Sequence, residues 1–212
     1  MHGLKVKDMK ITWLGHASFL IENADKKIYI DPFVLHDNPE KADVILITHE
    51  HFDHFDMDKI NSITSEKTEF FGPAGVIKKS GFGKVVRPDD TVSVSGVKIE
   101  VVEAYNVNKK FHPKGLGVGF VVDTGVRIYH AGDTDCIKEM KDLKNIDIAL
   151  LPVGGYYTMN VKEAADAANS FAPKIVVPMH YNSDKYGITG INANAEDLKK
   201  MIPGTLVLEP LV

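Results

Sequence analysis

The sequence contains a single cysteine, Cys136, among its 212 residues. One thiol cannot form an intramolecular disulfide, which excludes a disulfide-stapled scaffold and favours a reducing cytoplasm. No apolar run reaches the roughly 20 residues that a membrane-spanning helix needs. The stretch from Met1 to Lys10 mixes lysine and aspartate and lacks the apolar segment of a signal peptide. We therefore expect a cytoplasmic protein that does not enter a membrane.

An excess of positive charge is also missing. The chain has 25 Lys and Arg against 29 Asp and Glu, a formal net charge of −4. Nucleic-acid binding usually requires a basic patch, so we expect a small-molecule substrate and not a nucleic acid. The 44% hydrophobic content supports a core of useful size, and the length fits a single domain over residues 1–212. Self-association into a homo-oligomer stays open.

Histidine is abundant, and four candidate metal ligands lie close together: His49, His51, Asp53 and His54. They follow the apolar run 44–47, which is typical of a strand covered on both faces. Imidazole and carboxylate without cysteine suit zinc first, with manganese or iron as alternatives. Ligands this tightly spaced cannot all face one ion, so we expect His49 and His51 at one ion, and Asp53 with His54 at a second. The alternative is a solvated histidine-rich turn.

Other candidate ligands also follow predicted strands. His180 comes directly after the apolar segment 175–179, where a side chain leaves a buried strand and faces a cleft. Asp133 follows another strand, and Gly132 lets the backbone bend before it. A carboxylate can bridge two cations with its two oxygens, so Asp133 is the natural bridging ligand. His112 lies in a loop just before the strand expected at 117–122.

Hydrophobic patterning predicts the arrangement of the whole chain. Strands are expected over 10–14, 18–22, 27–30, 44–47, 69–71, 84–86, 91–94, 97–102, 117–122, 126–130, 147–151 and 174–177. Helices are expected over 56–60, 74–79, 161–171 and 195–201, and a turn at Ser95-Gly96. Two mostly β halves with interspersed helices predict two sheets packed face to face with helices outside.

Three motifs, in this order along the chain, resemble those of the metallo-β-lactamase superfamily of hydrolases: His49-x-His51-x-Asp53-His54, Gly132-Asp133-Thr134 and Pro178-Met179-His180. The segments 13–18 and 29–33 are similar to the branch that contains ascorbate-phosphate lactonases. This resemblance implies an α/β fold, a four-layer αββα sandwich with a dinuclear site at one edge of the sheets. It implies three sets of ligands: His49, His51 and a third histidine; Asp53, His54 and His180; and Asp133 between the two ions.

The third histidine departs from the family's pattern. The strand 97–102 runs into Glu103–Asn106, with no histidine before His112. Either the loop is longer and His112 completes the first site, or Asn106 or water replaces the ligand. We favour His112, because the segment 115–120 matches the family's run into the next strand.

Two divalent ions about 3.5–4 Å apart can hold a hydroxide between them at neutral pH. Asp53 is placed to orient this hydroxide and move its proton, which makes it the candidate catalytic residue. The sequence thus predicts a metal-dependent hydrolase that cleaves an ester, a lactone or a phosphodiester. The alternatives are a nuclease of the tRNA-processing kind, a di-iron redox enzyme, whose relatives typically have glutamate where this chain has His51, and a non-catalytic binding protein.

Four further features allow two interpretations each. His16 either supports or contacts the site, or orients its own loop. Asp31 either holds a metal-bound imidazole from behind or caps a strand. Cys136 is either a metal ligand or, as we expect, a small buried apolar group. The loop 153–159 either shapes a substrate pocket or is a plain connection.

Overall fold

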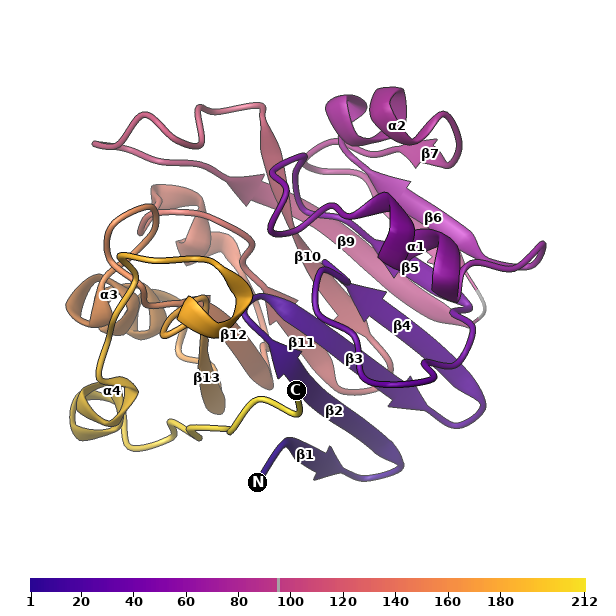
Figure 1. Cartoon of the computed structure of the whole chain (residues 1–212). Coiled ribbons are helices and arrows are strands. Elements are labelled where there is room, and N and C mark those ends of the chain that lie inside the picture. Colours follow the sequence, from indigo (N-terminus) through magenta and orange to yellow (C-terminus); the bar gives the residue numbers. More distant parts are fainter. Residues whose placement is uncertain (95) are drawn as a thin grey trace.

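The computed structural model describes residues 1–94 and 96–212, so the turn expected at Ser95 lies outside the described residues. Two mixed β-sheets form the centre of the molecule (Figure 1). The first sheet has the strand order β1-β2-β3-β4-β5-β6-β7. Its strands are β1 (Gly3–Val6), β2 (Met9–Gly15), β3 (Ser18–Asn23), β4 (Lys26–Ile30), β5 (Val44–Leu46), β6 (Glu69–Gly72) and β7 (Lys84–Val85).

The second sheet has the strand order β13-β12-β11-β10-β9-β8. Its strands are β8 (Thr91–Val94), β9 (Val97–Ala104), β10 (Gly117–Asp123), β11 (Arg127–His130), β12 (Ile148–Pro152) and β13 (Ile175–Met179). The helices are α1 (Met57–Ile63), α2 (Ala74–Ser80), α3 (Val161–Phe171) and α4 (Ala195–Met201), with 3-10 turns η1 (Lys138–Asp142) and η2 (Asp184–Tyr186). No helix among the described residues is long and apolar enough to cross a membrane.

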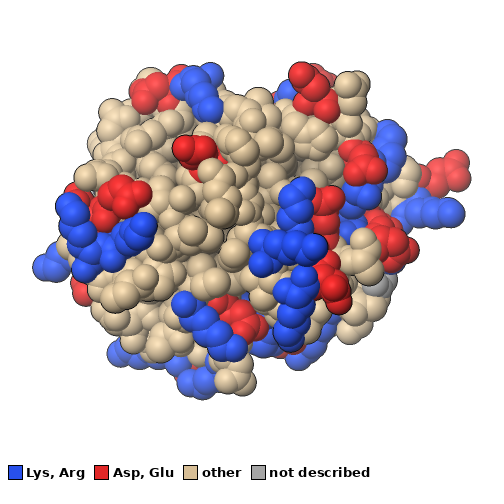
Figure 2. Space-filling model, turned by 90° about the horizontal axis from the view of Figure 1, so that it is seen from below, with Lys and Arg blue, Asp and Glu red and all other residues tan. Residues whose placement is uncertain are grey.

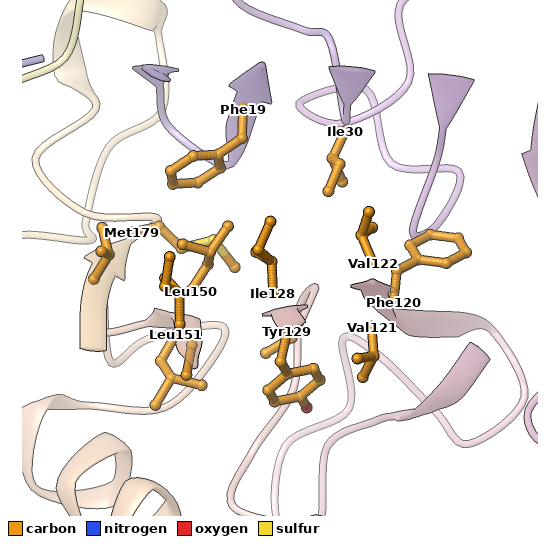
Figure 3. Packing of buried hydrophobic residues seen from close by; sticks show 14 of the residues in the cluster. Phe19, Ile30, Phe120, Val121, Val122, Ile128, Tyr129, Leu150, Leu151 and Met179 are labelled. Carbon is orange, nitrogen blue, oxygen red and sulfur yellow. The ribbon is translucent and has the colours of Figure 1, made fainter. Parts of the chain in front are cut away.

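Successive side chains of a strand point to opposite faces of the sheet, and those that point inward form the core between the two sheets. Figure 3 shows Phe19 and Ile30 of the first sheet directed toward Ile128 of the second. Tyr129 and Leu151 point away from this interface, toward the helices on the far side. Burying each such side chain contributes about 1.5–3 kcal/mol, so the inner faces supply much of the stability of the fold.

Helices cover both outer faces of the sheet pair (Figure 1). Ile60 of α1 and Val76 of α2 pack in a second cluster with Ile45 on the outer face of the first sheet. On the other side α3 packs beside β12 and begins with a capping box in which the Asn160 side chain accepts from the Glu163 amide. The predicted αββα arrangement is therefore confirmed.

Every predicted strand and helix is present, with ends that differ by at most three residues. The sequence analysis missed β1, which pairs antiparallel with β2 at the edge of the first sheet. Its residues are only partly buried, so the apolar alternation that marks a strand is weak there. The loops that follow β5, β11 and β13 and the β9–β10 loop together carry the predicted ligands, and the β2–β3 turn carries His16.

Candidate metal centre

Backbone geometry fixes where the candidate ligands leave the sheets. After β5 the chain turns tightly, with the amides of His54 and Phe55 both donating to the carbonyl of His51. Gly132, after β11, has a φ of 63°, and a Cβ there would lie 2.9 Å from the carbonyl oxygen of Val118. Only glycine fits this close approach without strain, and it lets Asp133 project beyond the strand end.

Three imidazoles form the first cluster. Nε2 of His49 lies 3.1 Å from Nδ1 of His51, and Nε2 of His112 lies 3.2 Å from the same atom. His49 and His112 are buried, and His51 is half-buried at the edge of a pocket. The structure therefore brings His112 to the position that the resemblance leaves open for a third histidine.

The second cluster contains Asp53, His54 and His180. Oδ2 of Asp53 lies 3.9 Å from Nε2 of His54 and 3.8 Å from Nε2 of His180. His16 is a fourth member, with its Nε2 3.1 Å from Oδ2 of Asp53. These four side chains offer ligand atoms close enough together to hold one ion.

Asp133 lies between the two clusters. Its Oδ2 is 3.2 Å from Nε2 of His112 and 3.0 Å from Nε2 of His180. Its Oδ1 is 3.3 Å from Nε2 of His54. One carboxylate thus faces imidazoles of both clusters, which is the position that a bridging ligand requires.

Several buried ligand atoms of the two clusters lack hydrogen-bond partners, as expected of atoms that bind cations. Nε2 of His54, Nε2 of His180 and Oδ1 of Asp133 are buried and have no hydrogen-bond partner among the described residues. Buried polar atoms without partners are costly, by about 1–3 kcal/mol each, so a partner is expected at this place. Converging lone pairs of nitrogen and oxygen atoms are a suitable donor set for a transition-metal ion.

Hydrogen bonds behind the imidazoles orient them. Nδ1 of His54 donates to Oδ2 of Asp31 at 2.7 Å. The Thr48 hydroxyl also donates to this carboxylate, at 2.6 Å, and accepts from Nδ1 of His49 at 3.0 Å. With Nδ1 carrying the proton, Nε2 of each ring presents a lone pair to the centre. Asp31 therefore supports the site, as one of its two interpretations proposed.

Asn106 orients the imidazole of His112 through a hydrogen bond from behind the ring. Its Oδ1 accepts from Nδ1 of His112 at 3.1 Å, and its Nδ2 donates to Asp135 at 3.2 Å. Lys109 donates to the same carboxylate at 2.6 Å, which anchors the β9–β10 loop to the residues after β11. Asn106 therefore lies behind the imidazole, and not in its place. The sequence analysis missed Asp135 and Lys109.

The electrostatics keep two imidazoles of the first cluster, those of His49 and His51, neutral. Burial, with His54 nearby, lowers the pKa of His49 well below its ordinary value, and burial with His112 nearby lowers the pKa of His51. A neutral imidazole is the form that binds a metal ion. The fully buried Asp133 stays ionised, because His180 and His54 lower its pKa although burial raises it.

The second cluster attracts positive charge. Burial lowers the pKa of His54, but Asp133 and Asp31 outweigh this effect and raise it well above its usual range. At Asp53, His54 and the hydrogen bond with His16 lower the pKa although burial raises it. Carboxylates concentrated in this way favour a proton or a cation at Nε2 of His54.

His130 and Cys136, close to Asp133 in the sequence, belong to neither cluster. His130 is buried, and its Nε2 donates to the carbonyl of Ala17 at 2.9 Å, away from the centre. Cys136 is exposed, so its prediction as a buried apolar group is wrong. The chain has already left β11 by this point, and Cys136 faces solvent while the next residue, Ile137, is buried in the core.

A pocket of about 330 Å³ opens onto the centre. Side chains of both clusters, among them Asp53 and His180, form its floor. Tyr157, from the loop 153–159, lines its wall together with Phe111. This loop therefore shapes the pocket, the first of its two interpretations.

A sequence profile for the beta-lactamase superfamily domain matches residues 10–180. A UPF0173 metal-dependent hydrolase of Thermoplasma acidophilum is 35% identical, and the match covers 97% of this chain and 96% of the relative. With its two-sheet fold and its cluster of histidines and aspartates, the chain belongs to the metallo-β-lactamase superfamily, and within it to the UPF0173 family of metal-dependent hydrolases.

Solved structures agree with this assignment. A protein described as a metal-dependent hydrolase from Parabacteroides distasonis has a TM-score of 0.86 and 40% identity, over 98% of this chain and 97% of that protein. A metallo hydrolase of the archaeon Ignicoccus hospitalis has a TM-score of 0.79 and 27% identity, over 95% of both chains. The di-iron β-hydroxylase CmlA of Streptomyces venezuelae, 13% identical with a TM-score of 0.74, shares the fold alone.

Proposed function

We propose that this protein is a dinuclear metal-dependent hydrolase that cleaves a small ester, lactone or phosphodiester. His49, His51 and His112 would hold one ion, and Asp53, His54 and His180 the other. Asp133 would bridge them. Zinc suits this nitrogen-rich donor set best, with manganese or iron as alternatives.

The position of Asp133 carries this proposal. Its Oδ2 lies within 3.2 Å of imidazole nitrogens from two different clusters, those of His112 and His180. A carboxylate that served one ion would need to face only one cluster. Burial raises its pKa, but His180 and His54 outweigh this effect and hold the pKa well below its ordinary value, so both oxygens are available as donors at neutral pH.

When bound, two such ions supply a water nucleophile at neutral pH and polarise the oxygen under attack. Asp53 provides the proton chemistry. Its carboxylate faces the pocket, its side chain is 13% exposed, and His16 fixes the direction of Oδ2. The ionised Asp53 can therefore accept a proton from the attacking water and donate it to the leaving group.

The test uses protein loaded with zinc or manganese and freed of excess metal. We expect hydrolysis of at least one substrate from a panel of esters, lactones and phosphodiesters, loss of activity with a chelator, and recovery when metal returns. Asp53→Asn should lower kcat by about 100-fold or more, since it removes the general base. His36→Ala, a surface histidine, is the matched control and should leave turnover unchanged. Full activity of chelated protein would contradict the proposal.

A further inference from the structure

The pocket beside the metal centre has an aromatic wall. The rings of Phe111 and Tyr157 are 4.8 Å apart at 75°, an edge-to-face arrangement. Tyr156 extends this group, 5.6 Å from Phe111. Phe52 lines the same pocket, and 70% of its surface is exposed. Exposed aromatic side chains that gather beside a cavity are typical of a ligand-binding surface.

The charges of the pocket are confined to its floor. Of the described side chains that line it, the ionised ones are Asp53 and Asp133, both within the metal centre, and none is a lysine or an arginine. Lys109, on the neighbouring loop, is held by Asp135 at 2.6 Å. A phosphate group outside the metal centre would therefore find no cationic partner in this pocket.

Elsewhere on the surface, charge is mixed in sign. On the face that Figure 2 shows, basic and acidic side chains lie next to one another around an area with few of either. The pocket itself, whose described lining holds no lysine or arginine, favours an uncharged substrate group over a phosphate.

We propose that Phe111, Tyr157 and Phe52 form a subsite for an aryl group of the substrate, so that the protein acts on neutral carboxylic esters or lactones that carry an aromatic ring. This proposal rests on the hydrolase function proposed above. A substrate ring in this pocket can make the offset or edge-to-face contacts that aromatic rings prefer with the three side chains that line it. The cavity of about 330 Å³ is at the small end for ligand sites, which suits one ring and the reacting group.

The subsite is fixed relative to the metal centre. Phe111 directly precedes His112, whose amide donates to Oδ1 of Asn106 at 2.9 Å and whose carbonyl accepts from the Asn106 amide at 2.7 Å. Nδ2 of Asn106 in turn donates to the carbonyl of Tyr157 at 3.0 Å. Through Asn106 both halves of the aromatic wall are held beside the imidazole, so the ring and the scissile bond would be positioned together.

The experiment compares methyl- and phenyl-substituted γ-butyrolactone as substrates of the zinc-loaded full chain. We expect the wild type to favour the phenyl lactone in kcat/KM by roughly tenfold or more. Phe111→Ala and Tyr157→Ala should each reduce this ratio by about 3-fold to 10-fold, mainly through KM. Phe82→Ala, which removes an exposed aromatic ring packed on Phe70, is the matched control and should leave the ratio unchanged.

Calorimetry gives a second measurement that needs no turnover. Phenylacetate should bind the zinc-loaded protein more tightly than acetate, and Phe111→Ala should remove this difference. The aryl subsite would be wrong if both lactones were hydrolysed without a phenyl preference, or if a phosphorylated substrate were preferred. Either result would still be consistent with the proposed hydrolase function. If neither lactone is cleaved, the ester and lactone function fails, and the two carboxylate affinities alone decide whether the aryl subsite exists.

Discussion

Oδ1 of Asn106 accepts two hydrogen bonds from His112, one from the backbone amide at 2.9 Å and one from Nδ1 at 3.1 Å. The ring therefore carries its proton on Nδ1, and Nε2 faces His51 with a free lone pair. This contact determines the different consequences of mutating the two residues.

His112→Ala should lower the affinity for one ion and leave the ion held by Asp53, His54 and His180 in place. Asn106→Ala should have a smaller effect, a loss of about 10-fold to 100-fold in affinity for the same ion, because the imidazole remains but is no longer oriented. Titration of each variant with zinc against a competing chelator measures both affinities.

His36→Ala is the control for these titrations, because its ring lies outside both clusters and hydrogen-bonds to the backbone carbonyl of Asp37. If Asn106→Ala lost an ion outright and His112→Ala kept both, Asn106 would be the ligand and the roles assigned in this loop would be reversed.

His16→Asn should reduce kcat and leave KM nearly unchanged. His16 has a φ of 51°, a left-handed conformation that asparagine tolerates, so the β2–β3 turn should survive the substitution. The variant removes the imidazole that lies 3.1 Å from Oδ2 of Asp53, and a misdirected base should cost about 10-fold to 100-fold in kcat. Burial, with His180 nearby, lowers the pKa of His16 to about 4, so the neutral ring is the active form over the physiological range.

Steady-state kinetics with the best substrate of the panel make this comparison, and circular dichroism verifies the fold of the variant. A normal kcat in a folded His16→Asn protein would show that Asp53 needs no support from His16.

The ion pair between Glu100 and Arg127 should make the stability of the folded protein depend on pH. Hydrogen bonds from Arg127 outweigh burial and lower the pKa of Glu100 from 4.5 to about 2. A carboxyl whose pKa is lower in the folded protein adds stability above pH 4.5 and loses it as the pH falls through about 2. Glu100→Gln should therefore destabilise the protein at pH 7 by on the order of 1 kcal/mol or less, since the pair is partly exposed.

Urea unfolding of both proteins at several pH values tests this. The difference in the free energy of unfolding between the wild type and Glu100→Gln should shrink between pH 4.5 and pH 2. In a protein in which Arg127 is already replaced by Gln, Glu100→Gln should have little effect on this free energy. A difference that stayed constant down to pH 2 would mean that the ion pair does not set the pKa of Glu100.

Local sequence was enough to predict much of this structure. The ligands between His49 and His54 follow a buried strand within a few residues, and Asp133 and His180 do the same. Strand ends are local features, and the side chains that follow them converge because the strands lie in two facing sheets. The strands and helices were predictable for the same reason, apart from the partly buried edge strand β1.

Contacts between distant segments were not predictable. The choice between His112 and Asn106 depends on Asp135 and Lys109, which are 26 residues apart and meet only in the fold. Cys136 is exposed although the next residue, Ile137, is buried, and this difference arises from packing after the strand end, which no local pattern encodes. The number of ions, their identity and the single-domain organisation stay predictions.

The central claim is that each chain binds two metal ions with Asp133 between them. Elemental analysis of zinc-loaded, desalted protein measures this directly, and we expect two ions per chain for the wild type. Asp133→Ala should weaken both ions and lose hydrolysis, because one carboxylate serves both clusters. One ion or fewer in the wild type, or two ions with normal turnover in Asp133→Ala, would contradict the account.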